Sequence, residues 1–150
     1  MGKVTSSIEI EASPEKVFDF VVSDKVNEVW KDMVESKWTS EKPIGLGSTA
    51  YYAGRHRYNK EEEWNAVVTE FTKNKSMTML FKGANKHSGD QTNYYAFEPT
   101  AKGTKLTFSM EYKPRYSILG KLLDALMIKR WINREDAKML ENIKKAVEAS

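Results

Sequence analysis

The chain ends with SILGKLLDALMIKRWINREDAKMLENIKKAVEA, residues 117–149, and this stretch decides the fold. Pro114 ends the preceding pattern and Ser117 is a suitable N-cap, so we expect one helix of about 30 residues and about 45 Å. At 100° per residue, one stripe of this helix collects Leu119, Leu122, Leu123, Leu126, Arg130, Asn133, Ala137, Leu140, Ile143 and Val147. Met127, Ile128, Trp131 and Ile132 lie outside that stripe. The first half of the helix is therefore apolar almost all round, which suits a buried position.

Before this helix the apolar residues alternate, as they do in half-buried strands. The N-terminal KVTSSIEIEAS, residues 3–13, alternates first, and SPEKVFDFV then predicts a helix that starts at Pro14 behind a Ser13 cap. SDKVNEVW, residues 23–30, predicts a second short helix. Polar turn clusters then separate six further strands, expected at 33–40, 48–57, 61–72, 76–83, 91–98 and 104–113.

This order predicts one α+β domain over residues 1–150. It contains a seven-stranded curved antiparallel sheet, two short helices after the first strand and a long C-terminal helix across the apolar face. A helix about 10 Å wide cannot fill the whole of a wide curved sheet, so we expect a cavity between helix and sheet.

Composition excludes several classes of protein. The 150 residues contain no cysteine, which excludes disulfides and thiolate sites. No apolar run approaches the roughly 20 residues of a membrane span, and we expect a soluble, cytoplasmic protein. The formal charge of +3 is small, and no strand shows a basic face with stacking aromatics, so nucleic-acid binding is not expected.

Evidence for catalysis is sparse. The two histidines, His56 and His87, are separated in the sequence and predict no metal site, and no cofactor motif is present. In Glu61-Glu62-Glu63, period two could turn Glu62 inward with Trp64, where burial would raise its pKa and allow general-acid chemistry. The alternative is that all three carboxylates are solvated near a hairpin.

Binding residues are easier to propose than catalytic ones. The seven methionines and seventeen aromatic residues would give an adaptable apolar lining, although the same residues are also ordinary core. The candidate ligand contacts are Trp30, Tyr51, Trp64, Met79, Tyr95, Phe97, Phe108, Met110, Leu122 and Leu126.

Arg130 is the remaining candidate, because the predicted stripe turns it inward. A buried arginine needs a partner, such as Glu62 or an anionic ligand head group. Alternatively, its stem covers apolar surface while the guanidinium reaches water. Residues 113–134 carry six basic side chains and one acidic one, a composition that also suits transient contact with an anionic membrane.

Several motifs, taken in order, resemble the START-like, or SRPBCC, superfamily, and in particular its polyketide cyclase/dehydrase and lipid transport branch. They are IEIEASPEKVFDFV from Ile8, Trp30, GLGS from Gly45, VVTEF from Val67 and YYAFEPTAKGTKLTFSMEY from Tyr94. The resemblance implies a helix-grip fold with a hydrophobic cavity. We therefore expect a carrier or sensor of a small hydrophobic or amphipathic ligand, lipid- or polyketide-like. The alternatives are a cyclase or dehydratase using the same cavity, and a protein-interaction module.

Overall fold

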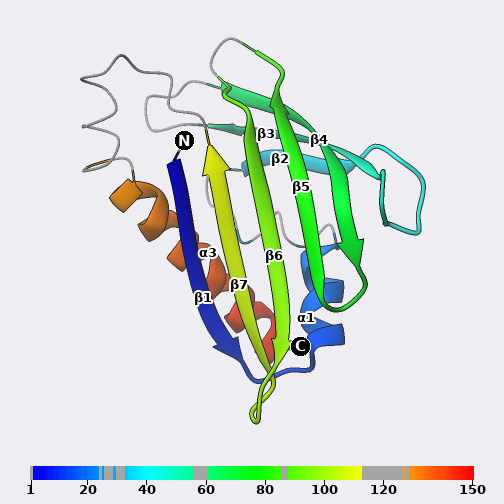
Figure 1. Cartoon of the computed structure of the whole chain (residues 1–150), viewed down its shortest axis with the longest axis vertical. Coiled ribbons are helices and arrows are strands. Elements are labelled where there is room, and N and C mark those ends of the chain that lie inside the picture. Colours follow the sequence, from blue (N-terminus) through cyan, green and yellow to red (C-terminus); the bar gives the residue numbers. More distant parts are fainter. Residues whose placement is uncertain are drawn as a thin grey trace.

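A computed structural model shows one antiparallel sheet of seven strands with helices against one face (Figure 1). It describes residues 2–23, 25, 29, 33–55, 61–85, 88–112, 127 and 129–150. The strands are β1 (Gly2–Ile10), β2 (Met33–Trp38), β3 (Thr49–Arg55), β4 (Glu61–Thr72), β5 (Ser76–Gly83), β6 (Gln91–Pro99) and β7 (Thr104–Tyr112). Their order in the sheet is β1-β7-β6-β5-β4-β3-β2. The predicted seven-stranded sheet is confirmed.

The helix α1 (Pro14–Val21) begins where its capping residues predict. Ser13 Oγ accepts a hydrogen bond from the Lys16 amide at 3.3 Å, and Pro14 occupies the first turn, where no amide donor is needed. The buried side of the helix carries Val17, Phe18 and Val21. Most of the second short helix predicted at 23–30 lies outside the described residues.

The helix α3 (Lys129–Glu148) makes most of its contacts with β1 and runs in the same direction (Figure 1). Ser6 Oγ donates to Asn133 Oδ1 at 2.8 Å near the start of the contact. Further along, Lys144 Nζ donates to the Glu9 carbonyl at 2.9 Å. Residues 117–126 of the predicted helix lie outside the described residues.

The buried stripe of α3 is rotated from the one predicted. It consists of Ile132, Asp136, Met139, Leu140, Ile143 and Val147. Arg130 and Ala137 are exposed, so their predicted inward positions are wrong; Asn133 is also exposed, although its side chain reaches Ser6 of β1. Leu140, Ile143 and Val147 of the predicted stripe are buried as expected, whereas Ile132, Asp136 and Met139 take the buried positions that the prediction gave to Arg130, Asn133 and Ala137.

One face of the sheet, which we call the concave face, carries the core and meets α1 and α3. Its members follow from the cross-strand register, for example Ser6–Phe108–Tyr95–Met77 across four strands. On β7 the alternation was predicted correctly, with Leu106, Phe108, Met110 and Tyr112 on the concave face.

Candidate ligand-binding site

The concave face has one end that is fully packed. Figure 1 places α1 and the C-terminus at this end of the sheet. Its side chains, which we call the closed-end group, are Val17, Phe18, Phe97, Leu106, Phe108, Leu140, Ile143 and Val147. All eight are buried, and the Phe18 ring meets Phe97 edge-on at 5.2 Å. This end is ordinary hydrophobic core.

The other end of the concave face is less completely buried, since half-buried side chains lie there beside buried Val4, Phe81 and Asn93. The half-buried side chains, which we call the open-end group, are Ser36, Tyr52, Glu62, Trp64, Gln91, Met110 and Tyr112. Trp64 is fixed by a hydrogen bond from its Nε1 to the Gly89 carbonyl at 3.0 Å. The Tyr52 ring packs against Phe81 at 4.8 Å. The group therefore presents fixed aromatic surfaces together with amide, hydroxyl and carboxyl groups.

A buried carboxyl lies between the two ends. Asp136 is 1% exposed, and its Oδ2 has no hydrogen-bond partner in the described parts of the chain. Burial, and then the charge of Glu135, raises the pKa of Asp136 to about 7. Burial also raises the pKa of the Tyr95 hydroxyl, with smaller contributions from Tyr52 and Asp136. The helix thus brings a carboxyl that can titrate near neutral pH within electrostatic reach of the concave face.

Six of the predicted ligand contacts lie on the concave face. Met79, Tyr95, Phe97 and Phe108 are buried there, and Trp64 and Met110 are half-buried. Phe97 and Phe108 belong to the closed-end group, whereas Trp64 and Met110 belong to the open-end group. Trp30, Leu122 and Leu126 lie outside the described residues.

The predicted inward position of Tyr51 is wrong. Cross-strand pairing puts its neighbour Tyr52 opposite Trp64 on the concave face, so Tyr51 points to the other side of the sheet. There Lys37 Nζ lies 5.6 Å from the centre of the Tyr51 ring. Since side chains alternate along a strand, assigning the face wrongly by one residue exchanges the two tyrosines.

Glu62 lies on the concave face, as one of the two alternatives for the Glu61-Glu62-Glu63 run expected. It pairs with Gly54 and shares the face of Trp64, and it is half-buried. Glu61 is exposed and lies 4.0 Å from Arg55 on the opposite face. Of the three carboxylates, Glu62 alone joins the open-end group.

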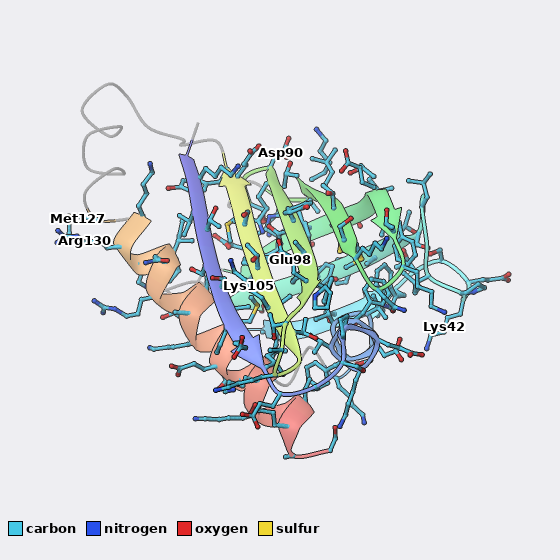
Figure 2. All side chains as sticks on the ribbon, turned by 60° about the horizontal axis from the view of Figure 1, so that its bottom comes forward. Lys42, Asp90, Glu98, Lys105, Met127 and Arg130 are labelled. Atoms are coloured by element: carbon cyan, nitrogen blue, oxygen red, sulfur yellow. The ribbon has the colours of Figure 1, made fainter. Side chains whose placement is uncertain are left out.

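The structure contradicts an inward Arg130. Its side chain is exposed at the start of α3, and Figure 2 shows it with Met127 on the side away from the sheet. The helix rotation that buries Ile132 and Asp136 turns Arg130 to water. Of the two alternatives for this residue, the solvated one describes its position.

Asp136 was missed from the sequence, although a signal was present. Ile132, Asp136, Met139, Leu140 and Ile143 are spaced by four, three, one and three residues, which is the period of one helix face. Centring the stripe on these residues would have placed an acid in the core. Because acidic side chains are normally exposed, a helical stripe that contains an aspartate is not expected to be the buried one.

The described residues contain neither a metal-binding cluster nor a membrane-spanning helix. Within them, no group of three or more His, Asp or Glu side chains converges to hold a metal ion. None of the helices in the described ranges is long and apolar enough to cross a membrane.

Structural comparison identifies the fold. The protein TTHA0849 from Thermus thermophilus has a TM-score of 0.80 at 16% identity, covering 99% of this chain and 98% of that one. The protein SA2116 of unknown function from Staphylococcus aureus has a TM-score of 0.74 at 12% identity, covering 99% and 94%. Ara h 8.0201 has a TM-score of 0.70 at 11% identity, covering 99% of each chain. A sequence comparison with curated proteins finds no match.

The sheet gripping a C-terminal helix defines a helix-grip protein of the START-like class. Residues 1–148 match the family described as polyketide cyclase / dehydrase and lipid transport, and the chain belongs to that family. Family and fold together support the coarse prediction of a hydrophobic ligand-binding cavity in a protein of this kind.

Proposed function

We propose that this protein binds a small hydrophobic or amphipathic molecule against the concave face of the sheet and acts as a carrier or sensor. The observation that carries this proposal is the half-buried open-end group. Its tryptophan and tyrosine rings lie beside polar groups on the core-facing side of the sheet. Such a mixture suits an apolar body with a few polar atoms. The family description is consistent with a lipid-like or polyketide-like ligand.

The neighbouring tyrosines on β3 provide a matched test. Tyr52→Ala removes a concave-face ring that packs on Phe81, whereas Tyr51→Ala removes the same side chain from the opposite face. The probe is N-phenyl-1-naphthylamine, an uncharged apolar fluorophore whose emission rises in apolar sites. Tyr52→Ala should weaken its binding about tenfold, the loss expected for one aromatic contact, whereas Tyr51→Ala should leave it within about twofold.

Equal effects of the two substitutions would place the probe elsewhere and contradict the site. An independent measurement is native mass spectrometry of the protein purified from its own host. A co-purified small molecule, released on denaturation, would give the chemical class of the ligand. Absence of a bound molecule together with no binding of the fluorophore would overturn the proposed function.

A cyclase or dehydratase is the second candidate, and Asp136 is the observation that favours it. A buried carboxyl with a pKa of about 7 can both donate and accept a proton near neutral pH. The test incubates a short poly-β-ketone with the wild type, Asp136→Asn and the exposed-residue control Glu141→Gln. An enzyme would consume the ketone at a rate lost only in Asp136→Asn. Binding without consumption would leave the carrier or sensor function.

A carrier must load its ligand, and we propose transient contact with anionic membranes in the cytoplasm as the route. Exposed Arg130 and Arg134 lie near exposed Met127 at the start of α3. This combination of basic and apolar groups suits a membrane surface. Flotation should recover more protein with anionic than with neutral liposomes, and added salt should remove the difference. Equal flotation with both would contradict membrane loading.

A further inference from the structure

Asp136 lies on the face of α3 that packs against the sheet, one turn after Asn133. Since Asn133 accepts a hydrogen bond from Ser6, this turn lies near the Ser6–Phe108–Tyr95 row of the sheet. Ile132 precedes Asp136 by one turn on the buried stripe, and Leu140 follows it by one turn. The carboxyl therefore lies among buried apolar residues, between the closed-end and open-end groups.

Among the described residues, the buried carboxyl has no hydrogen-bond donor to Oδ2 that would compensate its burial. Asp136 Oδ2 is shielded from solvent and accepts no hydrogen bond from any residue the structure describes. Buried carboxylates are normally paired with a cation or with several donors, because removing the charge from water is costly. A ligand group that donates a hydrogen bond to Asp136 Oδ2 would offset the free energy lost when the charge leaves water.

The charge of the concave face determines which donor fits. The described concave positions of the strands, together with the buried stripes of α1 and α3, include two acids, Glu62 and Asp136, and no Lys, Arg or His. The basic side chains of the same strands, such as Lys3, Lys37 and Lys82, lie on the other face or at exposed positions. A cationic ligand group would thus meet only acidic side chains at these positions, whereas an anionic group would meet repulsion.

We propose that Asp136 is the recognition point for a basic nitrogen of the ligand, so that the site takes a cationic amphiphile rather than a fatty acid. This inference rests on the proposed binding function and specifies its ligand. The protonated amine donates to Asp136 Oδ2, while the apolar body lies against Met110, Trp64 and Tyr52 of the open-end group. The Tyr95 hydroxyl lies within electrostatic reach of the same carboxyl.

Amine binding should depend on pH in a specific direction. Among the described residues, the ionisable groups near Asp136 are Glu135 on α3 and Tyr95 on β6. The concave positions of β1 and the buried stripe of α1 contain no ionisable side chain. Ionisation of Asp136 as the pH rises through about 7 should strengthen binding of an amine that remains protonated. An uncharged ligand of the same length should gain nothing from that ionisation.

Three probes of equal chain length test the inference: decylamine, decanol and decanoate, each titrated by calorimetry into the full-length protein. At pH 7.5 the wild type should bind decylamine at least about tenfold more tightly than decanoate. Asp136→Asn should reduce decylamine affinity about tenfold, to the level of decanol. Glu141→Gln, which removes an exposed acid from the same helix, should leave all three affinities unchanged.

A second measurement on the wild type does not depend on the variant folding. Between pH 6 and 8 the ratio of decylamine to decanol affinity should rise. If all three probes bind alike and neither Asp136→Asn nor pH changes their order, the inference is overturned while the binding function stands. If decanoate binds best, the inference is also overturned. If none of the three binds at any pH, the binding function and the inference fall together.

Discussion

The two ends of the concave face differ although the same strands build both. On β7, Phe108 is completely buried in the closed-end group, whereas Met110, two residues later on the same face, is half-buried in the open-end group. On β6, buried Phe97 and half-buried Gln91 differ in the same way. Because alternation gives both ends the same inward direction, the difference comes from what packs on them. The closed end has α1 and the second half of α3.

The largest expected effect comes from truncating two side chains of β7 that lie on the same face, one at each end of the sheet. Phe108→Ala should lower the free energy of unfolding by about 3–5 kcal/mol, because it leaves a cavity in fully packed core. Met110→Ala should cost only about 1 kcal/mol, because its side chain is half-buried and its surroundings can relax or admit water. Urea denaturation of both variants measures the difference. Equal losses would mean that the open end is packed as tightly as the closed end.

Asp136 marks the boundary between the two ends and should make stability depend on pH. Its pKa is about 7 in the folded state and near 3.8 in the unfolded chain, so the folded state holds the proton more tightly. The stability from this group is thus complete below about pH 4 and is lost as pH rises through 7, by about 4 kcal/mol in all. Asp136→Asn should remove this dependence and be more stable than the wild type at pH 8.

The measurement is the free energy of unfolding of the wild type and Asp136→Asn at a series of pH values from 4 to 8. Glu141→Gln is the control, because it removes an exposed acid and should keep the wild-type slope. A wild type whose stability does not fall between pH 5 and 8 would show that Asp136 is ionised and well compensated in the folded protein.

Removing the N-cap of α1, the helix that covers the closed end, should have a smaller effect on the free energy of unfolding. Ser13→Ala removes the oxygen that accepts from the Lys16 amide at the start of α1, and should cost about 1 kcal/mol. Ser13→Asp should retain most of the stability, since a carboxylate also caps. Thermal unfolding of the two variants gives the comparison. If Ser13→Ala loses no stability, the cap contributes nothing and α1 is held by its buried residues alone.

The smallest effect is expected at Arg130. It is exposed and belongs to neither end of the concave face, so Arg130→Ala should change the free energy of unfolding by less than about 0.5 kcal/mol. Decylamine affinity should also stay unchanged. If Arg130→Ala weakened the affinity for decanoate alone, Arg130 would bind an anionic ligand group, contrary to its exposed position in the structure.

Much of the fold could be read from the sequence because its signals are local. The cap at Ser13 and the alternation on β7 each involve neighbouring residues, and both are found in the structure, as are the turns that lie within its described residues. The strands predicted at 61–72 and 76–83 both have the observed bounds. Among the remaining described strand ends, the starts at 33, 91 and 104 agree, and those that differ do so by one or two residues, because pairing at an end depends on the neighbouring strand.

The site was predicted less well because it depends on rotations and register. Tyr51 and Tyr52 are both plausible inward residues, and only the pairing of Tyr52 with Trp64 decides between them. Arg130 and Asp136 both fall near one broad helical stripe, and a modest rotation exchanges which of them is buried. The sequence could place each residue on a strand or helix, but an error in register or rotation exchanges neighbouring residues between faces.

The sequence by itself therefore determined the order of elements, the alternation along each strand and the family resemblance, since these depend on residues close together in the chain. Only the tertiary structure decided which face of α3 meets the sheet, and hence that an aspartate rather than an arginine lies against it. The physical reason is that helix rotation is set by the summed packing of Met139, Leu140, Ile143 and Val147 against β1 and α1. Those contacts join residues more than a hundred positions apart, and no local pattern records them.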